Sequence, residues 1–268
     1  MKRLLLIFLC LLPVQAIFAA RTDKPKNNLT SVEEKRKREL MKRLSKDFDR
    51  EELNQIFYDS RLELITAAAP ASQPQPKPTK PKKSRGNPYL APGFGLLTKA
   101  SLERCKVFYL ANEKAFNAAE EKRKVPKEVI CGIFRIETNF GVPTKKSPHP
   151  LGKDLVVNSL YSLYVRNQKK REFAFNELKH FLRIAGKLGW DVFEIRGSGT
   201  GAIGLGQFEP SSYDNPNLVE DGNADGKIDL FVPADAIPST AKYLEASGWS
   251  DDPQDQLDAL LKYIKDSA

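Results

Sequence analysis

Hydrophobic residues recur at three- and four-residue spacing along most of the chain, which brings them to one face of an α-helix. This spacing predicts helices over residues 31–64, 97–119, 125–140, 155–164, 172–188, 238–247 and 254–265. Strand-like alternation is scarce. Residues 196–235 break the pattern, are rich in Gly, Ser, Asn and Asp, and are too long for a simple connection. We therefore expect a mostly α protein with one long irregular segment.

One carboxylate, Glu137, occupies a position where the helical pattern calls for an apolar side chain. It shares a helical face with Ile130 and Phe134, and Gly141 would end the helix one turn later. Glu137 thus lies in the last turn, where a cleft can form beside the following loop. Burial there would raise the pKa of the carboxyl group, as a general acid at neutral pH requires. The alternative is a solvated helix-end Glu paired with a nearby Arg or Lys.

The segment GSGTGAIGLGQFEPSSY, residues 197–213, combines glycines with hydroxyl and amide side chains. Glycine permits close backbone approach, while Ser198, Gln207 and Tyr213 can form hydrogen bonds. This composition suits a polyhydroxylated ligand. It does not favour a nucleotide phosphate, because no Lys-Ser/Thr pair follows the glycines and no strand precedes them. A tight turn against a neighbouring helix is the structural alternative.

The segment DGNADGKID, which begins at residue 221, matches the start of an EF-hand-like calcium loop. The predicted oxygen donors are the side chains of Asp221, Asn223, Asp225 and Asp235 and the main-chain carbonyl of Lys227. Val232 occupies the position of the usual bidentate Glu, so Asp235 is the natural substitute. A polar turn without metal is the alternative. Zinc is not expected, because the chain has two histidines and no zinc-ligand spacing.

The first twenty residues have a basic start, an apolar stretch and a small-residue end, which is typical of an export signal. An uncleaved membrane anchor is the alternative. The predicted division is a signal peptide at 1–20, an N-terminal helical segment at 21–66, a Pro/Lys-rich linker at 67–88 and the main domain at 89–268. The net charge of +9 favours anionic partners. Nucleic acid is not expected, because the basic runs lack interleaved aromatic residues.

Two cysteines remain after the signal peptide, Cys105 and Cys131. Each lies in a predicted helix. In an oxidising compartment they could form a disulfide that joins the two helices near Glu137. The other interpretation is a pair of buried free thiols that act as small apolar side chains. The sequence leaves both open.

Four motifs occur together in a fixed order: IETNFG around Glu137, GAIGLGQFEPSSY at 201–213, DGNADGKIDLFVPADAI at 221–237 and YLEASGW at 243–249. In this combination the chain resembles the family B lytic murein transglycosylases, glycoside hydrolase family 103. The resemblance implies a lysozyme-like transglycosylase domain with a structural calcium ion and no organic cofactor. It also implies an exported, periplasmic protein, free or held at the membrane by its N-terminus, and we expect a monomer.

The resemblance further implies cleavage of peptidoglycan glycan strands at the β-1,4 bond between N-acetylmuramic acid and N-acetylglucosamine, which leaves 1,6-anhydromuramic ends. Glu137 matches the single catalytic acid/base of the family. Ser198 and Gln207 match residues that line the family's sugar site, and Tyr243 matches an aromatic beside the catalytic Glu, so all three are expected to bind substrate.

Two departures from the family leave alternatives open. Lys169 and Lys170 stand where relatives carry paired arginines, and the sequence stops about where relatives continue with a further helix and a tyrosine near the site. One alternative is therefore a non-catalytic peptidoglycan-binding or scaffold protein. The other is a hydrolytic muramidase, for which Glu209 and Asp214 are the candidate second acids.

Overall fold

The computed structural model describes residues 29–65, 96–145 and 147–266, and these residues are mainly helical, as predicted. The helices are α1 (Ser31–Leu44), α2 (Arg50–Phe57), α3 (Lys99–Ala111), α4 (Glu113–Arg123), α5 (Lys127–Glu137), α6 (Val156–Arg166), α7 (Arg171–Leu188), α8 (Pro210–Tyr213), α9 (Pro233–Ala246) and α10 (Pro253–Asp266). A 3-10 turn, η4 (Asn139–Gly141), follows α5. Strands β1 (Asp154–Leu155) and β2 (Arg196–Gly197) pair antiparallel. The predicted signal peptide and linker lie outside the described residues.

Two predicted helices are each divided in two. The pattern over 31–64 contains α1, a turn and α2, because the carboxylate of Asp49 accepts hydrogen bonds from the first N–H groups of α2 and starts a new helix. The pattern over 97–119 divides at Asn112 between α3 and α4. Hydrophobic spacing continues across both breaks, which is why it did not reveal them. Helix α9 begins at Pro233, five residues before the predicted start at residue 238, since proline suits a first turn.

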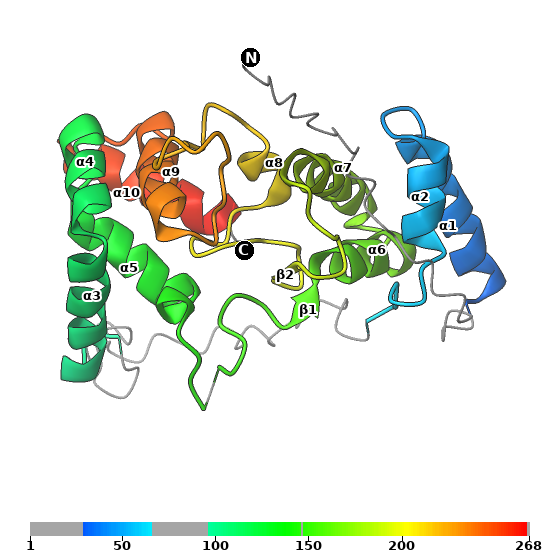
Figure 1. Cartoon of the computed structure of the whole chain (residues 1–268), viewed down its shortest axis with the longest axis horizontal. Helices are drawn as coiled ribbons and strands as arrows, with labels where there is room; N and C mark the ends of the chain where they lie inside the picture. Colours follow the sequence, from blue (N-terminus) through cyan, green and yellow to red (C-terminus); the bar gives the residue numbers. More distant parts are fainter. Residues whose placement is uncertain (1–28, 66–95, 146, 267–268) are drawn as a thin grey trace, which may run out of the picture.

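The helices form two groups on either side of the irregular segment (Figure 1). Helices α1 and α2 lie with α6 and α7 at one end of the molecule, while α3, α4, α5, α9 and α10 lie at the other. Within the groups, α6 packs against α7 and α1, and α4 packs against α9. The first ten residues of α6 are all buried, so this helix is the centre of its group. The long segment after β2 runs between the groups and meets the end of α5.

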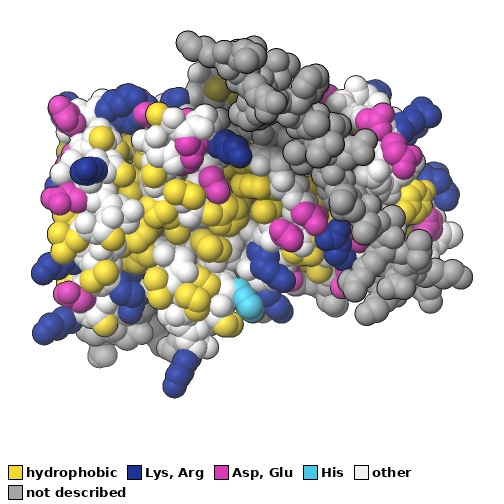
Figure 2. All heavy atoms as spheres, in the orientation of Figure 1, with side chains coloured by type: hydrophobic (Ala, Val, Ile, Leu, Met, Phe, Trp, Pro, Cys, Tyr) yellow, Lys and Arg dark blue, Asp and Glu magenta, His cyan; other side chains and the backbone are white. Residues whose placement is uncertain are grey.

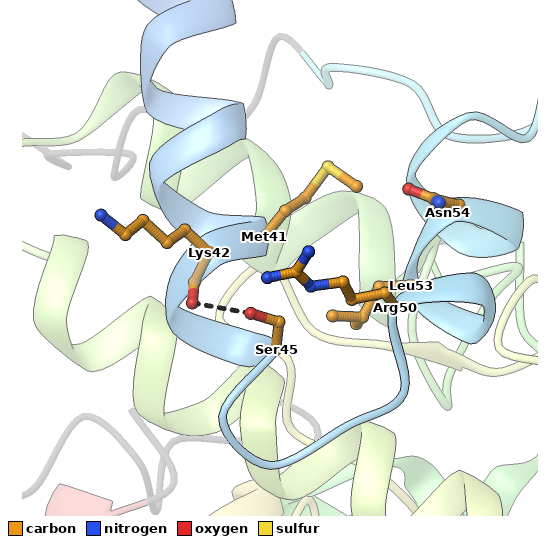
Figure 3. Close-up of a pocket in the computed structure, with 6 residues that line it drawn as sticks. All are labelled: Met41, Lys42, Ser45, Arg50, Leu53 and Asn54. Carbon is orange, nitrogen blue, oxygen red and sulfur yellow. Dashed lines mark hydrogen bonds between the residues drawn. The ribbon is translucent and has the colours of Figure 1, made fainter.

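None of the helices in the described ranges is both long and apolar enough to cross a membrane. A hollow of about 340 Å³ lies where α1 meets α2. Figure 3 shows Met41, Leu53 and Arg50 around this hollow, with Ser45 donating a 3.0 Å hydrogen bond from its hydroxyl to the Lys42 carbonyl. Neither of these helices carries a residue of the predicted site, and we assign the hollow no role in the chemistry.

A buried carboxylate ties α8 to α7. The Asp214 side chain is 4% exposed and accepts hydrogen bonds from His180 at 2.9 Å, Arg183 at 2.9 Å and Lys187 at 2.6 Å. Burial alone would raise the pKa of Asp214, but the hydrogen bonds from these three side chains hold the pKa below its usual value. Asp214 is therefore committed to an ion cluster with α7.

We expect this cluster to make the fold acid-sensitive. The pKa of Asp214 is lower in the folded state than in the unfolded chain, so its stabilisation is present at neutral pH and is lost as pH falls through the acid range. Asp214→Asn should lower the free energy of unfolding by about 2 kcal/mol at pH 7 and flatten its decline from about pH 5 to pH 3. Urea titrations at several pH values would measure both effects. An unchanged pH slope in the variant would contradict the assignment.

Candidate active site

Glu137 is the last residue of α5 and is half-buried. The apolar residues that share its face, Ile130, Ile133 and Phe134, are buried as predicted. The carboxylate thus lies where the core ends and the surface begins. This position allows contact with a ligand while limiting access of water.

The chain reverses direction immediately after Glu137. Asn139, Phe140 and Gly141 all have positive φ values, of 51°, 60° and 72°. The first two are strained, because side chains rarely adopt this conformation. Thr138 fastens the turn: its hydroxyl donates a 2.9 Å hydrogen bond to the carbonyl of Leu205 in the glycine-rich segment. A hydrogen bond therefore joins the end of α5 to the predicted sugar-binding segment.

Within the glycine-rich segment, the predicted substrate residues hold local turns. The Ser198 hydroxyl accepts hydrogen bonds from the main-chain N–H groups of Thr200 and Ala202 at 3.2 and 3.0 Å. Gln207 is buried, has φ 52°, and donates from its side-chain amide to the Gly204 carbonyl at 2.9 Å. These contacts give the segment a defined shape. They leave contact with a sugar as a prediction for both residues.

Tyr263 of α10 is a site residue that the sequence analysis missed. Its hydroxyl donates a 2.6 Å hydrogen bond to the Gly206 carbonyl, next to Gln207. Its ring packs edge-on against Tyr243 of α9, with ring centroids 5.0 Å apart, and against Phe208 at 6.0 Å. The predicted site residue Tyr243 thus belongs to a buried aromatic cluster. The signal in the sequence was the spacing of Tyr263 from Ala259, which puts both on the buried face of α10.

Electrostatics connect this cluster to the carboxylate. Burial, and after it the negative charge of Glu137, raises the pKa of Tyr263 well above its usual value. Glu137 therefore lies within electrostatic reach of the Tyr263 hydroxyl. The sequence left open how the site is completed at its C-terminal end, and α10 brings Tyr263 to the glycine-rich segment.

Gly206 is required by the hydroxyl that sits against it. A Cβ atom at this position would lie 2.6 Å from the Tyr263 oxygen and 3.0 Å from the Phe208 ring. We expect Gly206→Ala to cost about 1–3 kcal/mol of stability, because the packed cluster cannot accept the methyl group. In a Tyr263→Phe background the same substitution should cost about 1 kcal/mol less. Urea unfolding of the four proteins would test this, and strictly additive effects would contradict it.

The predicted calcium loop has a defined conformation. The Asp221 carboxylate accepts hydrogen bonds from the N–H groups of Asp225 and Gly226, at 3.2 and 2.8 Å. Gly226 has φ 85°, which suits the sharp turn expected there. Asp235 reaches the loop from α9, and its carboxylate accepts from the N–H groups of Gly222 and Asp229 at 2.9 and 2.8 Å. The structure therefore brings the late acid to the loop, as the sequence suggested.

The negative charges of the carboxylates in this loop favour a bound cation. Asp235 is 1% exposed, and burial followed by the charge of Asp221 raises its pKa, although main-chain hydrogen bonds oppose the shift. A divalent ion would offset the cost of these carboxylates. Within the described ranges, however, no three acidic, histidine or cysteine side chains converge closely enough to hold an ion. Calcium binding stays a prediction.

The surface around the site is apolar. Figure 2 shows hydrophobic side chains gathered on this face between α5 and the irregular segment. Ile136 and Val142, which flank the turn after Glu137, are 64% and 46% exposed. Exposed apolar groups beside a half-buried carboxylate are typical of a ligand-binding surface.

Comparison with known proteins gives the family. A model described as a transglycosylase SLT domain matches residues 33–263. Membrane-bound lytic murein transglycosylase B of Escherichia coli (strain K12) is 33% identical over 207 residues, which cover 75% of this chain and 54% of that protein. The chain thus spans about half the length of this curated relative.

Solved structures agree in fold. The E. coli lytic transglycosylase Slt35 in complex with calcium has a TM-score of 0.68 and 29% identity, over 80% of this chain and 64% of its own. The soluble lytic transglycosylase SltB1 from Pseudomonas aeruginosa has a TM-score of 0.67 and 27% identity, over 81% and 68%. These matches confirm the lysozyme-like, mostly α fold that the resemblance implied. The chain belongs to the transglycosylase SLT domain family, as its four ordered motifs predicted.

Proposed function

We propose that this protein is a peptidoglycan lytic transglycosylase that cleaves the bond between N-acetylmuramic acid and N-acetylglucosamine. The observation that carries the proposal is the position of Glu137, half-buried at the end of α5 and joined through Thr138 to the glycine-rich segment. Family membership supports the same reaction, because the relatives named above are lytic transglycosylases.

The chemistry needs one carboxyl group in two roles. Protonated Glu137 donates its proton to the glycosidic oxygen, so that the bond to the muramic C1 breaks and the N-acetylglucosamine side leaves as an alcohol. The resulting carboxylate then takes the proton of the muramic 6-hydroxyl, whose oxygen attacks C1. This closes the 1,6-anhydro ring and restores the protonated acid without consuming water.

The residues around Glu137 would bind and orient the glycan strand. Ser198 and Gln207 lie in the segment that Thr138 joins to α5, and Tyr243 packs in the aromatic cluster behind it. We propose these three as substrate-contacting residues. The net charge of +9 favours approach to peptidoglycan, whose peptide stems are anionic. The signal-like first twenty residues support a periplasmic location. We propose a monomer in which residues 89–268 form the catalytic domain.

We also propose calcium as a structural ion. Asp221, Asn223, Asp225, Asp235 and the Lys227 carbonyl would hold it. The ion would neutralise the repelling carboxylates and fix the segment that leads into α9. One support is Asp235, whose burial raises the pKa of its carboxyl group. The other is Slt35, whose structure is a complex with calcium.

The two alternative functions differ from the proposed one in what they would do to peptidoglycan. A hydrolytic muramidase needs a second acid, but one of the two candidates, Asp214, is committed to three basic side chains of α7. A scaffold protein would bind peptidoglycan and leave it intact. Asp214 is therefore disfavoured as the second acid, which leaves Glu209 as the candidate for a hydrolytic muramidase. The products formed from peptidoglycan distinguish these functions.

Mass spectrometry of the soluble products from purified peptidoglycan tests the proposal. We expect muropeptides with 1,6-anhydromuramic ends, which are one water lighter than the hydrolysed products. Reducing ends would point to hydrolysis. Sedimentation of the protein with peptidoglycan, without released products, would point to the scaffold function.

A further inference from the structure

One face of α3 packs against the helix that carries Glu137. Ser101, Cys105 and Phe108 follow each other at four- and three-residue spacing and so share that face. Ser101 accepts a 2.5 Å hydrogen bond from the guanidinium of Arg135 on α5. Phe108 packs edge-on against Phe134, with ring centroids 5.9 Å apart. Cys105 therefore lies in the middle of a packed interface between two helices.

The partner of Cys105 across this interface is Cys131 of α5. Both are free thiols in this structure. Cys131 precedes Phe134 and Arg135 by three and four residues, so it shares the face of α5 that packs against Ser101 and Phe108 and lies opposite Cys105. Cys131 is 3% exposed, whereas Cys105 is half-buried and therefore reachable from solvent. Burial, and next the contact with Cys105, raises the pKa of the Cys131 thiol. The pair thus has one accessible and one protected sulfur.

We propose that Cys105 and Cys131 are a site of disulfide formation that covalently joins α3 to the helix ending in Glu137. A disulfide requires two thiols close together, and the packing of α3 against α5 brings these two cysteines to one interface. The Ser101–Arg135 hydrogen bond and the Phe108–Phe134 ring contact hold the two helices together above and below the pair. The inference does not depend on the proposed enzymatic activity.

The oxidant would be a low-molecular-weight or protein disulfide. The Cys105 thiolate attacks one sulfur of that disulfide, which releases one thiol and leaves a mixed disulfide on Cys105. Cys131 then loses its proton and attacks the Cys105 sulfur, which releases the second thiol. Two protons and two electrons pass from the pair to the oxidant. The order follows from exposure, since the oxidant reaches Cys105 first.

Thiol counting tests the proposal on the full chain, with Cys10→Ser in every sample so that only this pair is scored. The protein is treated with oxidised glutathione, denatured, alkylated with a maleimide and weighed intact. We expect two alkylated thiols before oxidation and none after it, without bound glutathione. In the Cys131→Ala variant, Cys105 should instead retain one glutathione. Two alkylated thiols after oxidation, or a glutathione on each cysteine of the parent, would overturn the proposal.

Thermal unfolding gives an independent measurement. We expect the oxidised parent to unfold roughly 5–10 °C above its reduced form, because the cross-link restricts the unfolded chain. The Cys105→Ala/Cys131→Ala variant is the matched control and should unfold at one temperature under both conditions. An equal shift in this variant, or no shift in a parent shown by mass to be cross-linked, would contradict a cross-link that stabilises the α3–α5 interface.

Discussion

Glu137→Gln should lower the rate of anhydromuropeptide release by about a thousand-fold, the scale of a lost general acid and base. The amide has nearly the shape of the carboxyl group but cannot donate the proton to the glycosidic oxygen or accept the one from the 6-hydroxyl. Binding to peptidoglycan should persist, because the groups of the glycine-rich segment are unchanged. The measurement is the initial rate of product release, followed by mass spectrometry.

A matched control is available on the same helix. Glu128 is in the first turn of α5, with a side chain 73% exposed, so Glu128→Gln changes the same chemical group away from the site. It should keep the parental rate. The thermal unfolding temperature of both variants should stay close to that of the parent. If Glu137→Gln released products at a comparable rate while folded, the single-carboxylate mechanism would be wrong.

Calcium should raise the free energy of unfolding by about 2.7 kcal/mol when it is present at a hundred times its dissociation constant. The reason is that the ion binds the folded loop around Asp221 and Asp225, whose charges otherwise repel each other, and has no such site in the unfolded chain. Urea unfolding in calcium and in chelator would measure the difference. Magnesium should give a smaller effect, because it demands near-ideal octahedral geometry and loses its bound waters reluctantly, whereas EF-hand-like loops suit calcium.

The variant Asp225→Asn should remove most of this calcium dependence. Asp251→Asn is its control, because this exposed acid lies in another Asp-rich turn, after α9. It should respond to calcium as the parent does. If the parent unfolded at the same urea concentration with calcium and with chelator, the loop would be a polar turn held by its own hydrogen bonds.

The helices were predictable because their apolar spacing is local. The place of Glu137 in the last turn of α5 followed from the same spacing and from Gly141. The breaks before α2 and at Asn112 were harder to predict, since they depend on single residues that compete with a continuing pattern. The apolar spacing extends over several turns and does not reveal the effect of one such residue.

The contacts that complete the site could not be predicted in this way. Two hydrogen bonds, from the Thr138 hydroxyl to the Leu205 carbonyl and from the Tyr263 hydroxyl to the Gly206 carbonyl, join residues far apart in sequence. Their partners are carbonyl groups, which every residue carries. No residue type therefore marks the acceptor, and only the folded backbone identifies it. The resemblance matched Glu137 to the acid/base of the family and indicated a tyrosine on a further helix of the relatives, but it did not single out Tyr263 of α10.

The position of Tyr263 near the end of the chain also sets the order in which parts of the site can form during translation. A chain emerging from the ribosome can build α5 and the glycine-rich segment before α10 exists, because domains form from the N-terminus onward. Until α10 docks, the Gly206 carbonyl lacks its hydroxyl donor and the ring of Tyr243 has Phe208 but not Tyr263 packed against it. The packing behind Gln207 is therefore finished only after translation of the last described helix, so a nascent chain carries Glu137 before the proposed site around it is complete.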